Sequence, residues 1–201
     1  MESNDLRVVR ADSMDLFKKS VALQKSVYCN ERRYEDPNDH MDPYAFDDYD
    51  RERQTRRILI MGKDDIPLAT ARVIIPGSLK LPAFSLQPQI EESLSDKMPV
   101  VECSAFCASR SACKEAGVSQ KTRRKILLML IDSLCGLAEE IGLDHSVMTL
   151  EKVLYVYLQR CGFKLKAEGQ PVYYFGWRIT CWGSREDMVF GVKNASLSKT
   201  N

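Results

Sequence analysis

Residues 57–75 decide the fold class of this 201-residue chain, and they read Arg-Ile-Leu-Ile-Met-Gly-Lys-Asp-Asp-Ile-Pro-Leu-Ala-Thr-Ala-Arg-Val-Ile-Ile. Two apolar segments, residues 57–61 and 68–75, are rich in β-branched side chains, as strands usually are. The residues between them include Gly62, two aspartates and Pro67, which are common in turns. The pattern predicts a β-hairpin with a loop of about five residues.

Outward from this hairpin, the sequence predicts further short strands and amphipathic helices. We expect strands at residues 6–10, 100–107, 146–149, 163–167 and 172–180, helices at 14–29, 121–141 and 151–160, and a loop with a short helix at 79–95. Strands and helices do not alternate strictly, so the fold class is α+β. We expect one domain at residues 1–193 and a flexible C-terminal tail at 194–201.

The charges nearly cancel overall but are segregated along the chain. Lys and Arg number 29 against 28 Asp and Glu, a formal charge of +1, which does not indicate a nucleic-acid-binding protein. Residues 31–53, however, hold nine acidic and four basic side chains, and residues 110–125 hold six basic and one acidic. An acidic segment and a basic segment are therefore candidates for two different functions.

The cysteine pattern favours neither disulfides nor a metal site. The seven cysteines include no Cys-x-x-Cys pair, and the chain has two histidines, neither of them close to Cys103 and Cys107. We expect buried thiols in a reducing compartment and no metal. The N-terminus has no secretory signal pattern and no segment is long enough to span a membrane, so the sequence predicts a soluble cytoplasmic protein without stable membrane insertion.

Three charged features stand out from their local surroundings. Asp47, Asp48 and Asp50 crowd together, and such carboxylates repel one another unless cations or backbone N–H groups hold them. Arg72 interrupts an apolar strand and must be paired, for which an aspartate of the acidic segment is the nearest candidate. Glu102 lies in a predicted central strand, where desolvation raises the pKa of a carboxyl group and makes it a candidate general base.

These residues carry a resemblance to a known family. The matching motifs occur in the family's order and at its separations: Tyr28 with Tyr34, Asp47-x-x-Asp50, Ala69-Thr-Ala-Arg72 and Val101-Glu102-x-Ser104-x-Phe106. Together they resemble the acyl-homoserine-lactone (autoinducer) synthases and their relatives, the N-acyl amino acid synthases and the acyltransferases associated with exosortase systems. The order of predicted elements is also similar to that of the acetyltransferase (GNAT) superfamily, to which this family belongs.

The resemblance implies a single-domain GNAT-like fold and transfer of a fatty acyl group from acyl carrier protein to an amine. It implies no tightly bound cofactor, because the phosphopantetheine of the carrier brings the donor. In the lactone synthases charged residues occupy the positions of Gln24, Ala45 and Ala105. These charges are among those expected to bind S-adenosylmethionine, so their absence favours an N-acyl amino acid synthase over a lactone synthase.

The chemistry needs one base and no enzyme nucleophile. An α-amine is mostly protonated at neutral pH, and Glu102, directly or through a water, would remove its proton; alternatively, Glu102 is a structural partner of Arg72. Backbone N–H groups of residues 103–107 are expected to hold the oxyanion at a β-bulge. Asp47, Asp50 and Arg72 would form a charge network at the acceptor site, and Tyr28, Tyr34 and Phe106 a pocket suited to an aromatic amino acid such as tyrosine.

The basic segment precedes and opens the strongest predicted helix, where cations oppose the helix dipole and an anion should be near. The usual glycine-rich phosphate loop of coenzyme A-binding relatives is absent. The resemblance therefore implies that Arg110, Lys121, Arg123 and Arg124 receive the phosphopantetheine or dock an acidic carrier; the alternative is a solvated basic face. Two other functions stay open, a lactone synthase that uses S-adenosylmethionine and a non-catalytic module that binds carrier protein or lipid.

Overall fold

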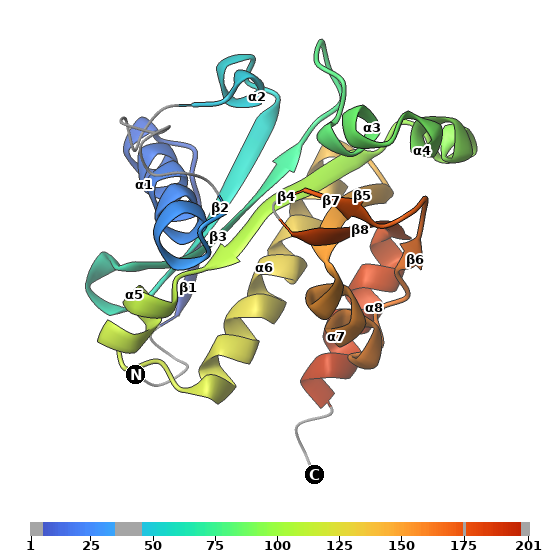
Figure 1. Cartoon of the computed structure of the whole chain (residues 1–201). Coiled ribbons are helices and arrows are strands. Elements are labelled where there is room, and N and C mark those ends of the chain that lie inside the picture. Colours follow the sequence, from blue (N-terminus) through green and yellow to red (C-terminus); the bar gives the residue numbers. More distant parts are fainter. Residues whose placement is uncertain (1–5, 35–45, 175, 198–201) are drawn as a thin grey trace. The chain divides into compact units, whose positions relative to one another are not determined.

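The strands of the computed structural model form one mixed sheet (Figure 1). The structure describes residues 6–34, 46–174 and 176–197. Within them, eight strands follow the order β1-β2-β3-β4-β5-β8-β6, and β7 also pairs with β8. Their bounds are β1 Arg7–Arg10, β2 Thr55–Met61, β3 Pro67–Ile74, β4 Val101–Ala108, β5 His145–Glu151, β6 Lys166–Ala167, β7 Val172–Tyr173 and β8 Trp177–Ser184. β4 and β5 are parallel, whereas β1 with β2 and β5 with β8 are antiparallel, so the α+β prediction is confirmed.

Helices connect these strands. The α-helices are α1 Met14–Lys25, α2 Asp48–Arg51, α3 Pro82–Leu86, α4 Pro88–Ser93, α5 Arg110–Glu115, α6 Gln120–Ile141, α7 Lys152–Arg160 and α8 Arg185–Leu197. A π-helical turn, η2 Ser26–Glu31, continues α1, and two short 3₁₀ turns are η4 Lys63–Asp65 and η5 Ser95–Lys97. None of the helices in the described residues combines the length and the hydropathy that a membrane crossing requires.

The chain divides into two compact units, each made of two chain segments. Unit 1 comprises Met1–Arg72 and Ala105–Leu134, and unit 2 comprises Val73–Ser104 and Cys135–Asn201. The division falls inside β3, β4 and α6. Each unit is therefore described by its own contacts, and the single domain at residues 1–193 stays a prediction.

Unit 1 is built on the hairpin with which the sequence argument began. Gly62 N–H donates to the Ile66 carbonyl at 2.8 Å and closes the turn between β2 and β3. α1 begins where predicted, because the Ser13 hydroxyl accepts the Leu16 N–H at 3.3 Å. Leu23 of α1 packs against Leu59 and Met61 of β2, which anchors the helix to the sheet.

Unit 2 differs from the sequence prediction at its C-terminal end. The strand expected at residues 172–180 is interrupted after Tyr173, because Gly176 has a φ of 108° and the chain turns there before β8 begins. The strand expected at 163–167 is formed only by Lys166–Ala167. α8 was not predicted, and it continues to Leu197 with Ala195 fully buried, so the flexible tail cannot begin at residue 194. Residues 198–201 lie outside the described part.

Candidate functional site

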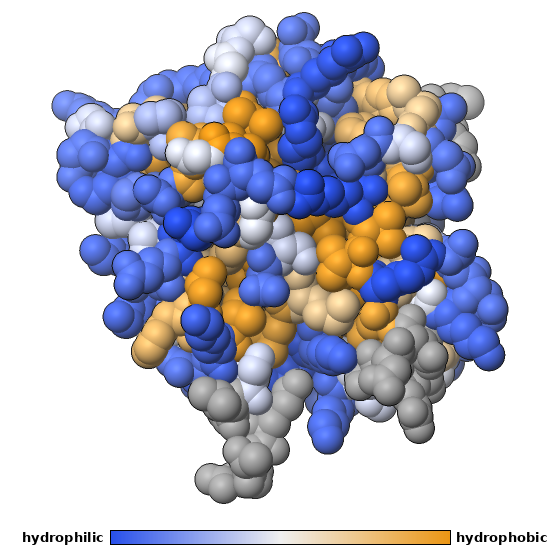
Figure 2. Space-filling model, turned by 180° about the vertical axis from the view of Figure 1, so that it is seen from behind, coloured by the Kyte–Doolittle hydropathy of each residue, from blue (hydrophilic) through white to orange (hydrophobic). Residues whose placement is uncertain are grey.

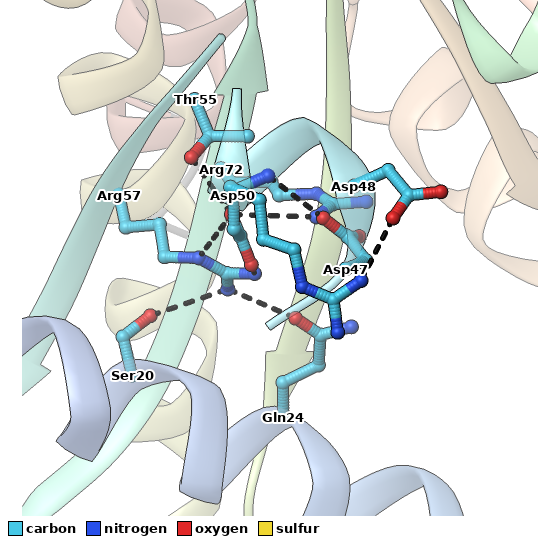
Figure 3. Close-up of polar contacts among 9 residues, drawn as sticks. Ser20, Gln24, Asp47, Asp48, Asp50, Thr55, Arg57 and Arg72 are labelled. Atoms are coloured by element: carbon cyan, nitrogen blue, oxygen red, sulfur yellow. Dashed lines mark hydrogen bonds and ion pairs between the residues drawn. The ribbon is translucent and has the colours of Figure 1, made fainter. Parts of the chain in front are cut away.

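A buried ion pair organises the polar side chains of unit 1 (Figure 3). The guanidinium of Arg57, on β2, contacts the Asp50 carboxylate at two points, Nη2 to Oδ2 at 2.8 Å and Nε to Oδ1 at 3.3 Å. The side chains are only 2% and 1% exposed. The Thr55 hydroxyl donates to the same carboxylate at 2.7 Å. Charge-assisted hydrogen bonds made at two points are stronger than hydrogen bonds between neutral groups. They can compensate the free-energy cost of removing both groups from water.

Asp47 couples the acidic segment to the neighbouring strand β3. As the N-cap of α2, its Oδ1 accepts the Asp50 N–H at 3.0 Å, while Oδ2 pairs with Nη1 of Arg72. Arg72 Nη1 also lies 3.7 Å from Asp50 Oδ1. The predicted pairing of Arg72 with an aspartate of the acidic segment is thus present, and Asp47 and Asp50 are held by one backbone N–H, the Thr55 hydroxyl and two guanidinium groups.

The pKa values of Asp47 and Arg72 reflect their contacts in this network. Burial raises the pKa of Asp47, but the charge and hydrogen bond of Arg72 and the Asp50 N–H outweigh it, so the pKa falls below its usual value. Burial lowers the pKa of Arg72, but the negative charges of Asp47 and Asp50 outweigh it and the pKa rises. Asp47 and Arg72 are therefore ionised at neutral pH.

The sequence prediction missed Arg57 as the centre of this network. Its Nη1 donates to Gln24 Oε1 at 2.9 Å and lies 3.5 Å from the Ser20 hydroxyl, both on α1. Its guanidinium carbon lies 5.3 Å from the centre of the Phe17 ring. Arg57, like Arg72, is a charged residue in an apolar strand, and both are buried. The sequence pattern that singled out Arg72 could therefore have identified Arg57 as well.

Two of the three predicted pocket residues are in contact. The rings of Tyr28 and Tyr34 meet edge to face with their centres 5.7 Å apart. Phe106 lies half-buried on the part of β4 that belongs to unit 1. Ala45, where the resemblance has an acidic residue, lies outside the described residues. The pocket itself stays a prediction.

A second polar cluster joins η2 to the start of α5. The Glu31 carboxylate accepts the Arg110 N–H at 2.7 Å, the Ser111 N–H at 3.2 Å, and the Ser109 and Ser111 hydroxyls at 2.7 and 2.8 Å. Burial raises the pKa of Glu31, but these donors outweigh it and lower the pKa below its usual value. No local sequence signal connects residues so far apart along the chain, and the cluster was not predicted.

Glu102 occupies the predicted central strand in unit 2. It is buried, and its Oε2 accepts the N–H of Ala83, in the first turn of α3, at 2.8 Å. β4 pairs with β5 at Val101 and Glu102. Ala105, three residues further along β4, has a φ of 51°, which interrupts the regular strand where a bulge was expected.

Three of the thiols are poor nucleophiles. Burial raises the pKa of Cys103, Cys107 and Cys181, for the last two to about 12, so all three stay protonated at neutral pH. In the described part of the chain, no group of three or more His, Cys, Asp or Glu side chains is placed to hold a metal ion.

The basic residues predicted to dock a donor lie in unit 1. Arg110, Lys121 and Arg123 are exposed, and Arg124 is half-buried. α6 begins directly before Lys121, and the Ser119 hydroxyl accepts the Thr122 N–H at 3.1 Å as a helix cap. The structure thus presents three of the four cationic side chains to solvent.

Replacing Asp50 by Asn should destabilise the protein by about 3–5 kcal/mol, because it leaves the buried Arg57 charge uncompensated. Asp48→Asn removes only an exposed carboxylate that pairs with Arg51 on the surface, and should change stability by less than about 0.5 kcal/mol. Urea unfolding of both variants at neutral pH measures the difference. Equal stability of the two variants would contradict the assigned role of Asp50.

Replacing Glu31 by Gln should destabilise the protein at neutral pH but not in acid. A carboxyl with a lowered pKa contributes stability above its unfolded pKa of about 4.3, and loses that contribution as the pH falls through the folded value. The difference between wild type and Glu31→Gln should therefore shrink below about pH 4. Glu115→Gln, at the exposed far end of α5, is the control. A pH-independent difference for Glu31→Gln would refute the assignment.

Comparisons with known proteins identify the fold of the chain. No family model matches the chain, and none of the curated proteins matches its sequence. Among solved structures, FeeM, an N-acyl amino acid synthase from uncultured soil microbes, superposes with a TM-score of 0.68 at 11% identity over 96% of this chain and 97% of FeeM.

Two lactone synthases are similar as well. The AHL synthase LasI superposes with a TM-score of 0.63 at 14% identity, covering 89% of this chain and 88% of LasI. BjaI, described as a CoA-dependent acyl-homoserine lactone synthase, gives 0.63 at 14% identity, covering 95% of this chain and 89% of BjaI. The chain therefore has the fold of these N-acyl amino acid and acyl-homoserine lactone synthases, as the sequence motifs predicted.

Proposed function

We propose that this protein is an N-acyltransferase that moves a long-chain fatty acyl group from acyl carrier protein to the α-amine of an amino acid. The observation that supports it best is the likeness to FeeM, which extends over nearly the full length of both chains. The buried Asp50, the ionised Asp47 and Arg72, and the buried Glu102 add to this, because they are the charged residues that the resemblance requires.

In the proposed reaction Glu102 is the general base. It removes a proton from the ammonium group of the acceptor, directly or through a water, and the free amine attacks the thioester carbonyl. The nitrogen gives up its second proton as the carbon–sulfur bond breaks and the amide forms; one of the two protons passes to the carrier thiolate and the other is released to solvent. No enzyme nucleophile is required, which agrees with the raised pKa values of Cys103 and Cys107.

The backbone of β4 supports the proposed place for the oxyanion. The left-handed backbone at Ala105 turns the neighbouring N–H groups away from regular strand geometry, which is how a bulge frees donors for a ligand. Two or more such donors, fixed before the reaction, stabilise the negative oxygen of the tetrahedral intermediate. We place the oxyanion near residues 103–107.

The charge network and the tyrosines form the proposed acceptor site. Asp47 keeps exposed surface although it is paired, since its side chain is 43% exposed, so its charge can act on the ammonium group of an acceptor. We place Tyr28 and Tyr34, whose rings are in contact, beside this network, and with Phe106 they would suit an aromatic side chain such as that of tyrosine. Arg72 would orient the carboxylates rather than touch the acceptor.

The proposed donor is an acylated carrier protein, which carries its phosphopantetheine on an acidic surface. Exposed Arg110, Lys121 and Arg123, with half-buried Arg124, are complementary to such a partner. The CoA dependence of BjaI means that the same fold also serves a CoA-linked donor, so the two donors are compared directly in the assay.

Replacing Glu102 by Gln should lower turnover by about 10²–10⁴-fold, the usual contribution of a general base. The assay mixes the protein with acylated carrier protein or acyl-CoA and a pool of amino acids, and follows free thiol and the mass of the acylated amine. Glu92→Gln, an exposed residue of α4, is the matched control. Unchanged turnover of a folded Glu102→Gln variant would assign the base elsewhere.

The same assay separates the alternatives. Consumption of S-adenosylmethionine with release of a lactone would identify a lactone synthase. Binding of acylated carrier protein with a thioester that survives every amine tested would identify a non-catalytic module. An acyl-amino acid product formed without S-adenosylmethionine supports the proposal.

Replacing Arg123 and Arg124 by Ala should raise KM for acylated carrier protein about tenfold with little change in kcat, because the charges act on docking. The effect should fade as ionic strength rises from about 0.05 M to about 0.5 M, where the Debye length is short. Lys63→Ala, an exposed cation in the β2–β3 turn, is the control. An undiminished effect in high salt would exclude electrostatic docking.

A further inference from the structure

Three large apolar side chains stay exposed at one end of the unit 2 sheet. Val153, Tyr173 and Trp177 are 79%, 75% and 64% exposed. Tyr173 on β7 and Trp177 on β8 are register partners. Glu151, the last residue of β5, is the register partner of Arg178, so the start of α7 at Lys152 and Val153 lies at the same end. We call Lys152, Val153, Tyr173 and Trp177 the aromatic end.

The backbone at the aromatic end is braced. Tyr174 N–H donates to the Gly176 carbonyl at 2.9 Å, and Arg178 Nε donates to the Tyr174 carbonyl at 3.0 Å. The rings of Tyr173 and Trp177 meet edge to face, with centres 5.8 Å apart and planes at 84°. The two aromatic rings are therefore in contact with each other while both remain largely exposed to water.

This exposure is unusual for β8. Side chains alternate along a strand, so Trp177 shares a side of β8 with Ile179 and Cys181, which are half-buried and fully buried. The apolar side of the strand thus continues into solvent at the aromatic end. Figure 2 shows hydrophobic residues exposed on the face seen from behind Figure 1, so exposure alone does not single out this end. The contact between two exposed aromatic rings does, together with an exposed lysine, Lys152, directly after the last residue of β5.

The charges at this end favour an anionic partner. Arg178 Nη1 lies 3.6 Å from Glu151 Oε1, so the nearby carboxylate is already paired. Lys152 is exposed and forms no ion pair with any residue that the structure describes. Trp and Tyr rings prefer the boundary between hydrocarbon and water, and lysine is attracted to anionic head groups.

We propose that the aromatic end binds the surface of a lipid bilayer that contains anionic lipids. Trp177, Tyr173 and Val153 enter the head-group region, and Lys152 pairs with lipid phosphate. The contact is interfacial, so it requires no membrane-spanning helix. Binding does not depend on the reaction; only its use, the release of an acylated product next to lipid, rests on the proposed function.

Tryptophan fluorescence tests this site directly, because the chain has two tryptophans, Trp177 and Trp182. In a Trp182→Phe variant, the emission of Trp177 should shift to the blue on titration with vesicles of phosphatidylcholine and phosphatidylglycerol. The shift should be weaker with phosphatidylcholine alone. Co-sedimentation of the wild-type protein with the same vesicles gives a second measurement that needs no substitution at Trp182.

Trp177→Ser should lower the vesicle partition coefficient about tenfold, as expected for loss of an aromatic ring that becomes buried in the bilayer. Phe190→Ser, which removes an aromatic ring 48% exposed on α8, should leave it unchanged. Equal binding of wild type and Trp177→Ser overturns the proposal. So does a blue shift that appears without vesicles and grows with protein concentration, which would indicate a second copy of the chain instead.

The proposal of a membrane-binding site and the proposed reaction can be refuted independently of each other. The Glu102→Gln variant should bind vesicles as the wild type does, whereas Trp177→Ser should keep its turnover with acylated carrier protein in vesicle-free buffer. Loss of turnover in vesicle-free Trp177→Ser would place the aromatic end in the reaction and overturn its assignment as a lipid-binding surface.

Discussion

The ion pair of Arg57 with Asp50 is the contact on which the candidate site of unit 1 depends. α2 has only four residues and cannot be stable as an isolated helix. It is held because Asp50 is bound by a guanidinium from β2 and Asp47 by one from β3. Two strands fixed by the apolar core therefore determine where α2 lies.

Ion pairs with aspartates explain why two arginines, Arg57 and Arg72, are tolerated in apolar strands. A buried guanidinium without a partner costs several kcal/mol, roughly 3–5 when a pair is broken. Here each is matched by one aspartate, and the remaining N–H groups of Arg57 meet Gln24 and Ser20 on α1. The network thus connects the sheet, α1 and α2 through hydrogen bonds, and a change at one member affects the others.

The sequence was sufficient for features that depend on local pattern. The hairpin, the start of α1 at Met14, the buried Glu102 and the need of Arg72 for an acidic partner all follow from neighbours in the chain. Arg57 was missed because it begins an apolar segment, where a charged residue usually points to solvent. The Glu31 cluster was missed because its donors are 78–80 residues away and no local rule relates them. The break after Tyr173 depends on the backbone conformation of Gly176, and the apolar pattern around this glycine did not indicate it.

Arg57 also changes how the substitution at position 24 is interpreted. The resemblance has an arginine where this chain has Gln24, which suggests a site with one positive charge fewer. In the structure the Gln24 carbonyl oxygen accepts a hydrogen bond from Arg57, so a guanidinium is present beside this position but comes from β2. An arginine at position 24 would bring a second positive charge against Arg57, with one fully buried carboxylate to share. Gln24 and Arg57 therefore belong together, and the charge that holds α2 is supplied from the sheet rather than from α1.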